Sequence, residues 1–103
     1  MAAYILAVCK VTNPHDNFKK YSALSAELVH KHGGKYIVRG PAKRSIHGDL
    51  LDDKVVIISE FPSMTELEAF VDSDEYQNEI SPLREGSGVY HFAAYESPTP
   101  PPA

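Results

Sequence analysis

The sequence predicts an α+β domain, a four-stranded antiparallel sheet with its helices on one face. Two observations lead to this fold class. Four segments rich in Val, Ile, Leu and Tyr alternate with two helical segments in the order β-α-β-β-α-β. Each helical segment has one apolar stripe, and such a stripe needs a sheet or another helix to pack on. The chain has 103 residues, which is the length of one such domain.

The first strand and the first helix occupy the N-terminal third of the chain. Residues 3–11 are almost continuously apolar, which is typical of a strand buried on both faces. We expect Asn13 to cap the helix and Pro14 to take its first position. The helix then shows an apolar stripe at spacings of three and four, formed by Phe18, Tyr21, Leu24 and Leu28. Gly33-Gly34 ends it, because glycine adopts the left-handed cap conformation without strain.

The second and third strands are expected to form a hairpin. Residues 35–39 make a short strand that Gly40-Pro41 interrupts, because proline cannot donate a hydrogen bond to the ladder. We expect a bulge or a kink at Gly40-Pro41 and a polar continuation over residues 43–47 as an edge strand. Residues 55–61 are the most apolar strand, which indicates a central position.

The remaining elements complete the predicted sheet. A second helix begins at Ser63, and a short helix follows from residue 74 to about residue 80. One further turn covers residues 82–85, and residues 89–96 form the last strand. The complete order is that of the split βαβ, or ferredoxin-like, arrangement.

The predicted sheet carries apolar side chains on both of its faces. The helices cover one face, so the other face needs a second cover, and a second copy of the sheet is the simplest one. The sequence therefore favours a homodimer with two sheets face to face. The alternative is that the extra apolar residues are an accident of short strands. We expect one domain over residues 1–96 and a mobile, Pro-rich tail over residues 97–103.

Composition and charge exclude several classes of partner. The net charge is −4, from ten Lys and Arg against fourteen Asp and Glu, and no basic stripe is interleaved with aromatic residues. We therefore expect no nucleic-acid partner. The apolar N-terminal run is too short to span a membrane and lacks the basic start of a signal peptide. Cys9 is the single cysteine, so an internal disulfide is excluded, and we expect a cytoplasmic protein with no membrane partner.

Four segments of the chain together resemble a known family. They are Gly33–Gly40, Val55–Ser63, Asp72–Tyr76 and Leu83-Arg84. With these segments, the chain from about residue 4 to residue 95 resembles the DUF1330 family of uncharacterised small proteins, in the dimeric α/β-barrel superfamily. The resemblance implies a ferredoxin-like protomer, a dimer with facing sheets and a cleft in each protomer. It implies no known reaction.

Relatives in that superfamily include cofactor-free monooxygenases, polyketide cyclases, haem-using enzymes and muconolactone isomerases. The chain departs from the family pattern before the Ser-x-Glu-Tyr motif, where a tryptophan or another aromatic residue is usual. Phe70 takes that place here, and the chain contains no tryptophan.

Arg39 and Glu60 form the first candidate catalytic pair. Counting back from the turn at Leu50-Leu51, and allowing for a bulge at Gly40-Pro41, places the two side chains opposite each other at one end of the sheet. One interpretation is a structural ion pair that closes the strand ends. The other is an anion-binding arginine with an orienting carboxylate, since a guanidinium binds two carboxylate oxygens at once.

His91 is the third candidate catalytic residue. It lies in the last strand, and an imidazole is well suited to proton transfer near neutral pH. The alternative is a hydrogen-bonded structural histidine. Tyr36, Tyr76 and Tyr95 are candidates for substrate binding through their hydroxyl groups, or else core residues with a solvated tip.

Metal and cofactor sites are not expected. His30 and His32 are two residues apart on a helix, so they point to different sides. Gly86-Ser87-Gly88 precedes a strand and therefore lacks the helix N-terminus that phosphate binding uses. Cys9 lies inside the first strand and is expected to be a small core residue.

Two hypotheses of different classes remain open. The first is a dimer that binds a small organic molecule, a carboxylate or a phenol, in a cleft and acts on it by proton transfer without a cofactor. The second is a non-catalytic ligand-binding or protein-interaction module. Convergence of Arg39, Glu60 and a tyrosine or histidine on one pocket favours the first.

Overall fold

The protein folds as a four-stranded sheet with helices on one side. The structure is a computed structural model that describes residues 1–97. Its main elements are β1 (Ala3–Val11), α1 (Asp16–Lys31), β2 (Lys35–Pro41), β3 (Val55–Phe61), α2 (Met64–Val71) and β4 (Gly88–Glu96). A π-helical turn, η1 (Glu75–Ile80), and a 3-10 turn, η2 (Ser81–Arg84), connect α2 to β4.

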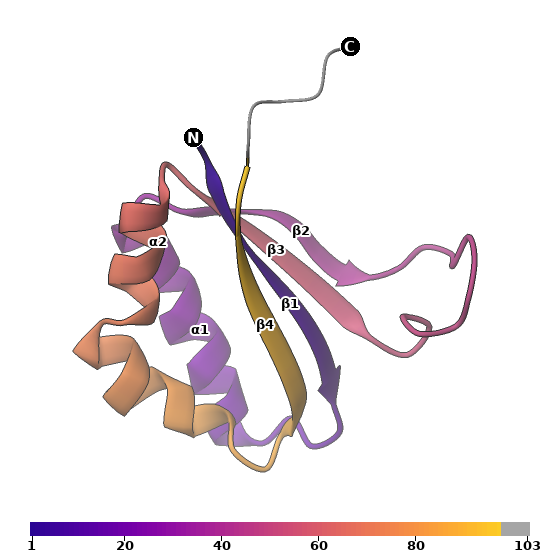
Figure 1. Cartoon of the computed structure of the whole chain (residues 1–103). Coiled ribbons are helices and arrows are strands. Elements are labelled where there is room, and N and C mark those ends of the chain that lie inside the picture. The colour runs from indigo at the N-terminus through magenta and orange to yellow at the C-terminus, as the bar shows by residue number, and fades with distance from the viewer. Residues whose placement is uncertain (98–103) are drawn as a thin grey trace.

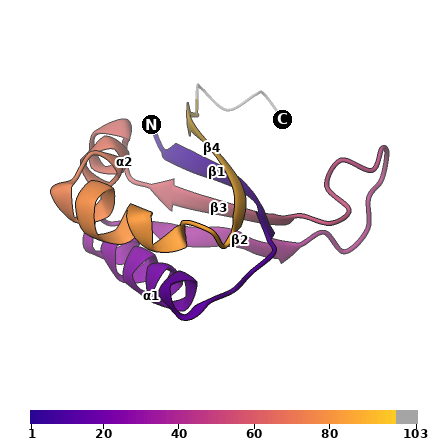
Figure 2. The same cartoon turned by 90° about the horizontal axis from the view of Figure 1, so that it is seen from below.

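The sheet has the strand order β2-β3-β1-β4, and every neighbouring pair is antiparallel. Figure 1 shows α1, α2 and the turns before β4 on one side of the sheet, and Figure 2 shows the same layering from below. The connection between β2 and β3 extends beyond the sheet at the end away from α2. The predicted ferredoxin-like fold is confirmed, with β1 and β3 in the centre.

The hydrophobic core fills only one end of the helix-facing surface. Ala3 and Phe61 are paired across β1 and β3 at this end, and Phe61 is 1% exposed. The helical layer supplies the other core residues, which belong to the same cluster as Ala3 and Phe61: Leu28, Val29, Leu67, Phe70 and Ile80. Burial of a phenylalanine side chain of this kind contributes about 2–3 kcal/mol. The other end of the same surface is covered less completely, which leaves room for a cleft.

The second strand differs from the prediction in two ways. The register shift lies between Tyr36 and Val38, whereas Gly40 and Pro41 stay in the ladder opposite β3. The expected bulge at Gly40-Pro41 is therefore wrong, because β2 is an edge strand and an edge position tolerates a proline. Residues 43–47 are not a strand but part of the loop to β3.

The start of α1 also differs from the prediction. His15, not Asn13, is the N-cap, and its Nδ1 accepts a hydrogen bond from the Phe18 amide at 2.9 Å. Its Nε2 lies 2.8 Å from the Glu85 carbonyl oxygen, so the proton is on Nε2 and the ring is held at both nitrogens. Asn13 donates its backbone amide to the Ser87 carbonyl at 2.9 Å and belongs to the preceding turn.

The end of α1 agrees with the prediction and explains both glycines. Gly33 has a φ of 79°, the left-handed conformation of a helix cap. Gly34 is needed for space, since a Cβ there would lie 2.8 Å from both the Phe61 ring and a Val29 methyl group. Within residues 1–97, none of the helices combines the length and the apolarity needed to cross a membrane. The predicted tail lies outside the described residues, except for Ser97, whose amide donates to the Ala2 carbonyl at 2.9 Å.

We predict that Gly34→Ala lowers the free energy of unfolding by about 1–3 kcal/mol, because the new methyl group overpacks the core. Urea denaturation measures the loss. Gly48→Ala is the matched control, since its Cβ meets no atom within 4 Å and only its φ of +77° is unfavourable. An equal or smaller loss for Gly34→Ala than for Gly48→Ala would contradict the packing argument.

Candidate functional site

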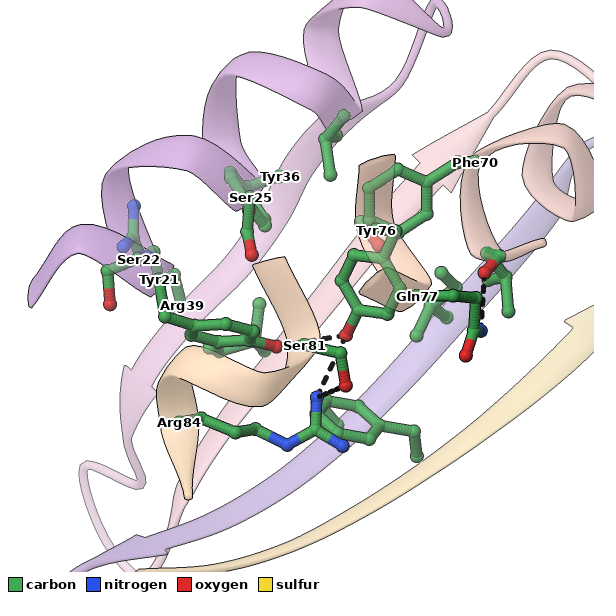
Figure 3. Close-up of a pocket in the computed structure, with 17 residues that line it drawn as sticks. Tyr21, Ser22, Ser25, Tyr36, Arg39, Phe70, Tyr76, Gln77, Ser81 and Arg84 are labelled. Carbon is green, nitrogen blue, oxygen red and sulfur yellow. Dashed lines mark hydrogen bonds between the residues drawn. The ribbon is translucent and has the colours of Figure 1, made fainter. Parts of the chain in front are cut away.

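A cleft lies between the sheet and the helical layer, beside the hydrophobic core. Its inner part has a volume of about 290 Å³ and is bounded by α1, by the end of α2, by η1 and η2, and by residues of all four strands (Figure 3). An adjoining part of about 370 Å³ extends toward Cys9 and Tyr90. The two parts share walls formed by Tyr21, Ser22, Arg39, Ile57 and Phe92. Volumes of this size are typical of pockets for small organic molecules.

The floor of the cleft is one row of side chains across all four strands. The strand register aligns Arg39 with Ile57, Ile57 with Ala7, and Ala7 with Phe92. Adjacent strands are about 4.8 Å apart, so the row spans about 14 Å between the two edge strands. An arginine stands at the β2 end of this row, and an aromatic ring stands at the β4 end.

Arg84 of η2 lies above the β4 end of this row. Its Nη1 donates to the Tyr76 hydroxyl at 3.2 Å and to the Ser81 hydroxyl at 3.0 Å. Among residues 1–97, no carboxylate lies within ion-pair distance of its guanidinium. The guanidinium instead faces three aromatic rings, at 5.6, 5.5 and 4.9 Å from the centroids of Tyr21, Tyr90 and Phe92.

Two tyrosines meet beside Arg84. The hydroxyl groups of Tyr21 on α1 and Tyr76 on η1 are 3.0 Å apart. Burial raises the pKa of Tyr21, and the Tyr76 phenol raises it further, so Tyr21 stays protonated near neutral pH. The two hydroxyls carry two protons, and their mutual hydrogen bond uses one of them. The other phenolic proton is available to an acceptor in the cleft.

Ser25 brings a third hydroxyl group to the same place. It lies one helical turn after Tyr21 on α1, is 7% exposed, and points into the cavity in Figure 3. Its hydroxyl lowers the pKa of Tyr21, but it makes no hydrogen bond of standard geometry within the described part of the chain. A buried hydroxyl without such a bond is costly in an isolated protein, and an acceptor in the cavity removes that cost.

Arg39 marks the opposite end of the cleft. It is exposed, and its guanidinium carbon lies 5.0 Å from the centroid of the Tyr36 ring. Burial raises the pKa of Tyr36, whereas the nearby Arg39 charge lowers it. Within residues 1–97, Arg39 also has no carboxylate at ion-pair distance. The cleft therefore has one cation in its interior and one at its mouth.

Comparison with known proteins identifies the family and agrees with the fold. The model of the domain of unknown function DUF1330 matches residues 2–97. The chain belongs to the DUF1330 family. A search of curated proteins found no significant sequence match for this DUF1330 protein.

Solved structures resemble this DUF1330 protein over nearly its whole length. A protein of unknown function from Rhodopseudomonas palustris is 17% identical with a TM-score of 0.69, covering 96% of this chain and 84% of its own. SnoaB, a cofactor-independent oxygenase from Streptomyces nogalater, is 10% identical with a TM-score of 0.60, covering 99% and 98%. A conserved protein from Methanosarcina mazei is 17% identical with a TM-score of 0.57, covering 95% and 94%. At these low sequence identities, the comparisons show that the proteins share a fold.

The predicted pairing of Arg39 with Glu60 is wrong. Arg39 lies opposite Ile57 and faces the cleft, whereas Glu60 lies on the other face of the sheet. The partner of Glu60 is Lys35, with 3.5 Å between Nζ and Oε1. Glu60 also lies across from Tyr4 and accepts a hydrogen bond from its hydroxyl, which raises the pKa of Tyr4.

The remaining predicted residues divide between the two faces of the sheet. Tyr36 and Tyr76 line the cleft of the DUF1330 protein, as a binding role requires. His91 and Tyr95 alternate with the cleft-lining Phe92 and therefore point to the other face, where they lie opposite Val8 and Tyr4. His91 therefore does not face the cleft, as a general base acting there would have to.

Sequence reasoning missed Arg84, Tyr21 and Ser25 as site residues. Tyr21 belongs to the predicted apolar stripe, and Arg84 belongs to a segment that resembles the family, so both carried a signal. Ser25 carried a weaker one, as a polar residue one turn from Tyr21 on the inner side of a helix. Their meeting depends on η1 and η2, whose path is not evident from local sequence.

The chemistry of the cleft is that of hydrogen-bond donors and positive charge. Of the described residues that line it, none is Asp, Glu or His. Burial raises the pKa of the Cys9 thiol, which favours its neutral form, although the Arg84 charge opposes this shift. Within residues 1–97, no three His, Cys, Asp or Glu side chains are grouped to hold a metal ion. The arrangement can bind and stabilise an anion.

We predict that Tyr21 makes the protein less stable at alkaline pH. An unfolded tyrosine loses its proton near pH 10, whereas folded Tyr21 keeps it because its pKa is raised. This stabilisation is fully present below about pH 10, and above it the free energy of unfolding falls by up to about 1.4 kcal/mol per pH unit. Urea denaturation of wild type and Tyr21→Phe across this range should show a shallower decline for the variant.

Tyr95→Phe is the control, because Tyr95 is 53% exposed and lies on the other face. It should follow the wild-type decline. Equal slopes for wild type and Tyr21→Phe would contradict the burial of a protonated Tyr21.

Proposed function

We propose that this DUF1330 protein binds a small organic acid in the cleft between its sheet and its helices. The observation that carries the proposal is the pair of arginines, Arg84 and Arg39, that face one cleft without a carboxylate partner among the described residues. Taking a guanidinium partly out of water is unfavourable unless an anion or an aromatic face accompanies it. An anionic ligand therefore suits the half-buried Arg84, and the exposed Arg39 adds positive charge at the mouth of the same cleft.

The residues that line the cleft indicate the chemistry of the rest of the ligand. The inner part is lined mainly by apolar and aromatic side chains, among them Ile5, Val29, Ile57, Phe70 and Phe92. These surfaces fit an apolar body of modest size, such as an aromatic ring or a short unsaturated chain. The ligand class that combines both features is a compact carboxylate or phenolate.

Proton-transfer catalysis without a cofactor is the second candidate function. Its support is the set of hydrogen-bond donors and positive charge in the described cleft lining, which can stabilise a developing oxyanion. In this version the acidic substrate gives its proton to solvent water and is held in the cleft as the reactive anion. A non-catalytic binding module is the alternative, and turnover of a bound phenol or enone distinguishes the two.

The homodimer and the cytoplasmic location are part of the proposal. The open face of the sheet carries Val38, Ile58, Leu6 and Ala93 in one register row, and none of these four side chains is fully buried. A second copy packed sheet to sheet removes this apolar surface from water. A buried free thiol at Cys9 suits the reducing cytoplasm.

We predict that Arg84→Gln weakens the binding of small acids by roughly ten- to a hundredfold, the loss expected for a charged hydrogen bond of about 1.5–3 kcal/mol. A thermal-shift screen with carboxylic acids, phenols and enones finds the ligands, and calorimetry measures their affinity. Arg39→Gln should weaken binding less, because Arg39 is exposed at the mouth.

Arg44→Gln is the matched control, since it removes the same charge from the exposed loop between β2 and β3. It should bind like wild type. Equal affinities of Arg84→Gln and wild type for every acid, or equal losses for Arg84→Gln and Arg44→Gln, would remove Arg84 from the site.

We predict that the wild-type protein has twice the 11.4 kDa chain mass by light scattering at micromolar concentration. Ile58→Glu should give a folded monomer, because it places a charge in the centre of the open face. Leu50→Glu, in the exposed loop, should remain a dimer. A wild-type mass of one chain contradicts the proposed dimer.

A further inference from the structure

We infer that Ser25, Tyr21, Tyr76 and Arg84 form an oxyanion subsite that binds the acidic group of the ligand in its ionised form. We call these four residues the donor cluster. The inference rests on the proposed function and deepens it, because it names the group that is recognised and the residues that contact it. It assigns Ser25 as a ligand-contacting residue.

The donor cluster is assembled from three elements. Ser25 and Tyr21 come from α1, Tyr76 from η1 and Arg84 from η2, and Figure 3 shows them around one part of the cavity. The chain of contacts runs from the Arg84 guanidinium to the Tyr76 hydroxyl at 3.2 Å and on to the Tyr21 hydroxyl at 3.0 Å. The arrangement is held in place before any ligand arrives, as preorganised binding of a charge requires.

The unused hydrogen-bonding capacity of the donor cluster consists of donors. Arg84 can only donate, and its hydrogen bonds to Tyr76 and Ser81 both start from Nη1, which leaves Nη2 and Nε for another acceptor. One phenolic proton of the tyrosine pair is available, and the Ser25 hydroxyl beside Tyr21 makes no hydrogen bond of standard geometry in the described structure. A group that accepts several hydrogen bonds and carries a negative charge complements this set.

Burial of the Ser25 hydroxyl is the second, independent observation. It points into the cavity and lacks a hydrogen bond of standard geometry in the described structure. Native structures rarely leave a buried hydroxyl in this state. A carboxylate or phenolate oxygen in the cavity satisfies it, together with the free phenolic proton.

Ionisation of the ligand follows from the same geometry. A neutral carboxylic acid or phenol brings a proton of its own to a place where donors already converge. Loss of that proton removes the conflict and adds attraction to the guanidinium. The subsite therefore selects aryl carboxylates and phenolates over the corresponding amides, amines and un-ionised phenols.

Calorimetry with probes of one shape tests the inference. Benzoate, benzamide and benzylamine share a ring and differ in the charge and donors of the head group. We expect benzoate to bind at least about tenfold more tightly than either of the others, as one charged hydrogen bond implies. 4-Nitrophenol should gain affinity as the pH rises through its ionisation, whereas phenol should gain none below about pH 9.

Variants of the donor cluster test which of its residues contribute to the affinity for benzoate. Ser25→Ala and Tyr76→Phe should each lower the affinity for benzoate about three- to thirtyfold. This loss is smaller than the one expected when a charged group is removed. Ser25→Ala should leave the melting temperature of the free protein unchanged or higher, because it removes an unsatisfied buried hydroxyl. Ser45→Ala is the control, since it removes the same hydroxyl group from the exposed loop between β2 and β3, outside the cleft.

The possible results distinguish a failure of the proposed function from a failure of the oxyanion subsite alone. If neither benzoate nor 4-nitrophenolate binds at up to about 10 mM, the proposed function itself fails. If benzoate binds and Arg84→Gln abolishes binding, but Ser25→Ala and Tyr76→Phe bind like Ser45→Ala, the proposed function stands and the oxyanion subsite is wrong. Binding of benzamide as tight as that of benzoate likewise overturns the subsite.

Discussion

The guanidinium of Arg84 is the group on which the proposed site depends. It bonds to hydroxyls of η1 and η2 and faces aromatic rings from α1 and β4, so it links the helical layer to an edge of the sheet. Among residues 1–97, it has no carboxylate partner. An arginine can remain partly buried in this way because aromatic faces and neutral acceptors offset part of the lost hydration. Its full charge thus stays available to a ligand.

The two faces of the sheet have different roles because strand residues alternate. On the helix-facing side, the core at the Ala3–Phe61 end stabilises the fold, and the cleft occupies the remaining surface. On the other side, Lys35, Glu60, Tyr4 and Tyr95 form one row across the four strands. Polar and charged groups therefore occupy one end of this open face, while its centre is apolar.

The sequence predicted the strands well because their signals are local. The limits of β1 and β3 agree with the predicted residues 3–11 and 55–61, since both are largely apolar runs. The pairing of Arg39 with Glu60 failed because a shift of one residue in register moves a side chain to the opposite face. The irregularity falls between Tyr36 and Val38, not at Gly40, and nothing in the local sequence indicates this.

The donor cluster was hard to predict for a different physical reason. Tyr76 reaches the cavity from a π-helical turn, a rare conformation that has no clear sequence signature. Arg84 meets Tyr21 only through tertiary packing, because the two residues lie far apart in the chain. Apolar periodicity identifies the inner side of α1, but it does not tell which polar residues there are left with open hydrogen bonds.

A crystal structure with 4-bromobenzoate is the most direct test of the central claim, that the cleft binds an acid through Arg84. The anomalous signal of bromine fixes the orientation of the ligand without ambiguity. We predict that the carboxylate lies against Arg84, Tyr76 and Ser25, with the bromine toward the apolar floor near Ile57. A ligand bound with its bromine at Arg84, or bound only outside the cleft, would contradict it.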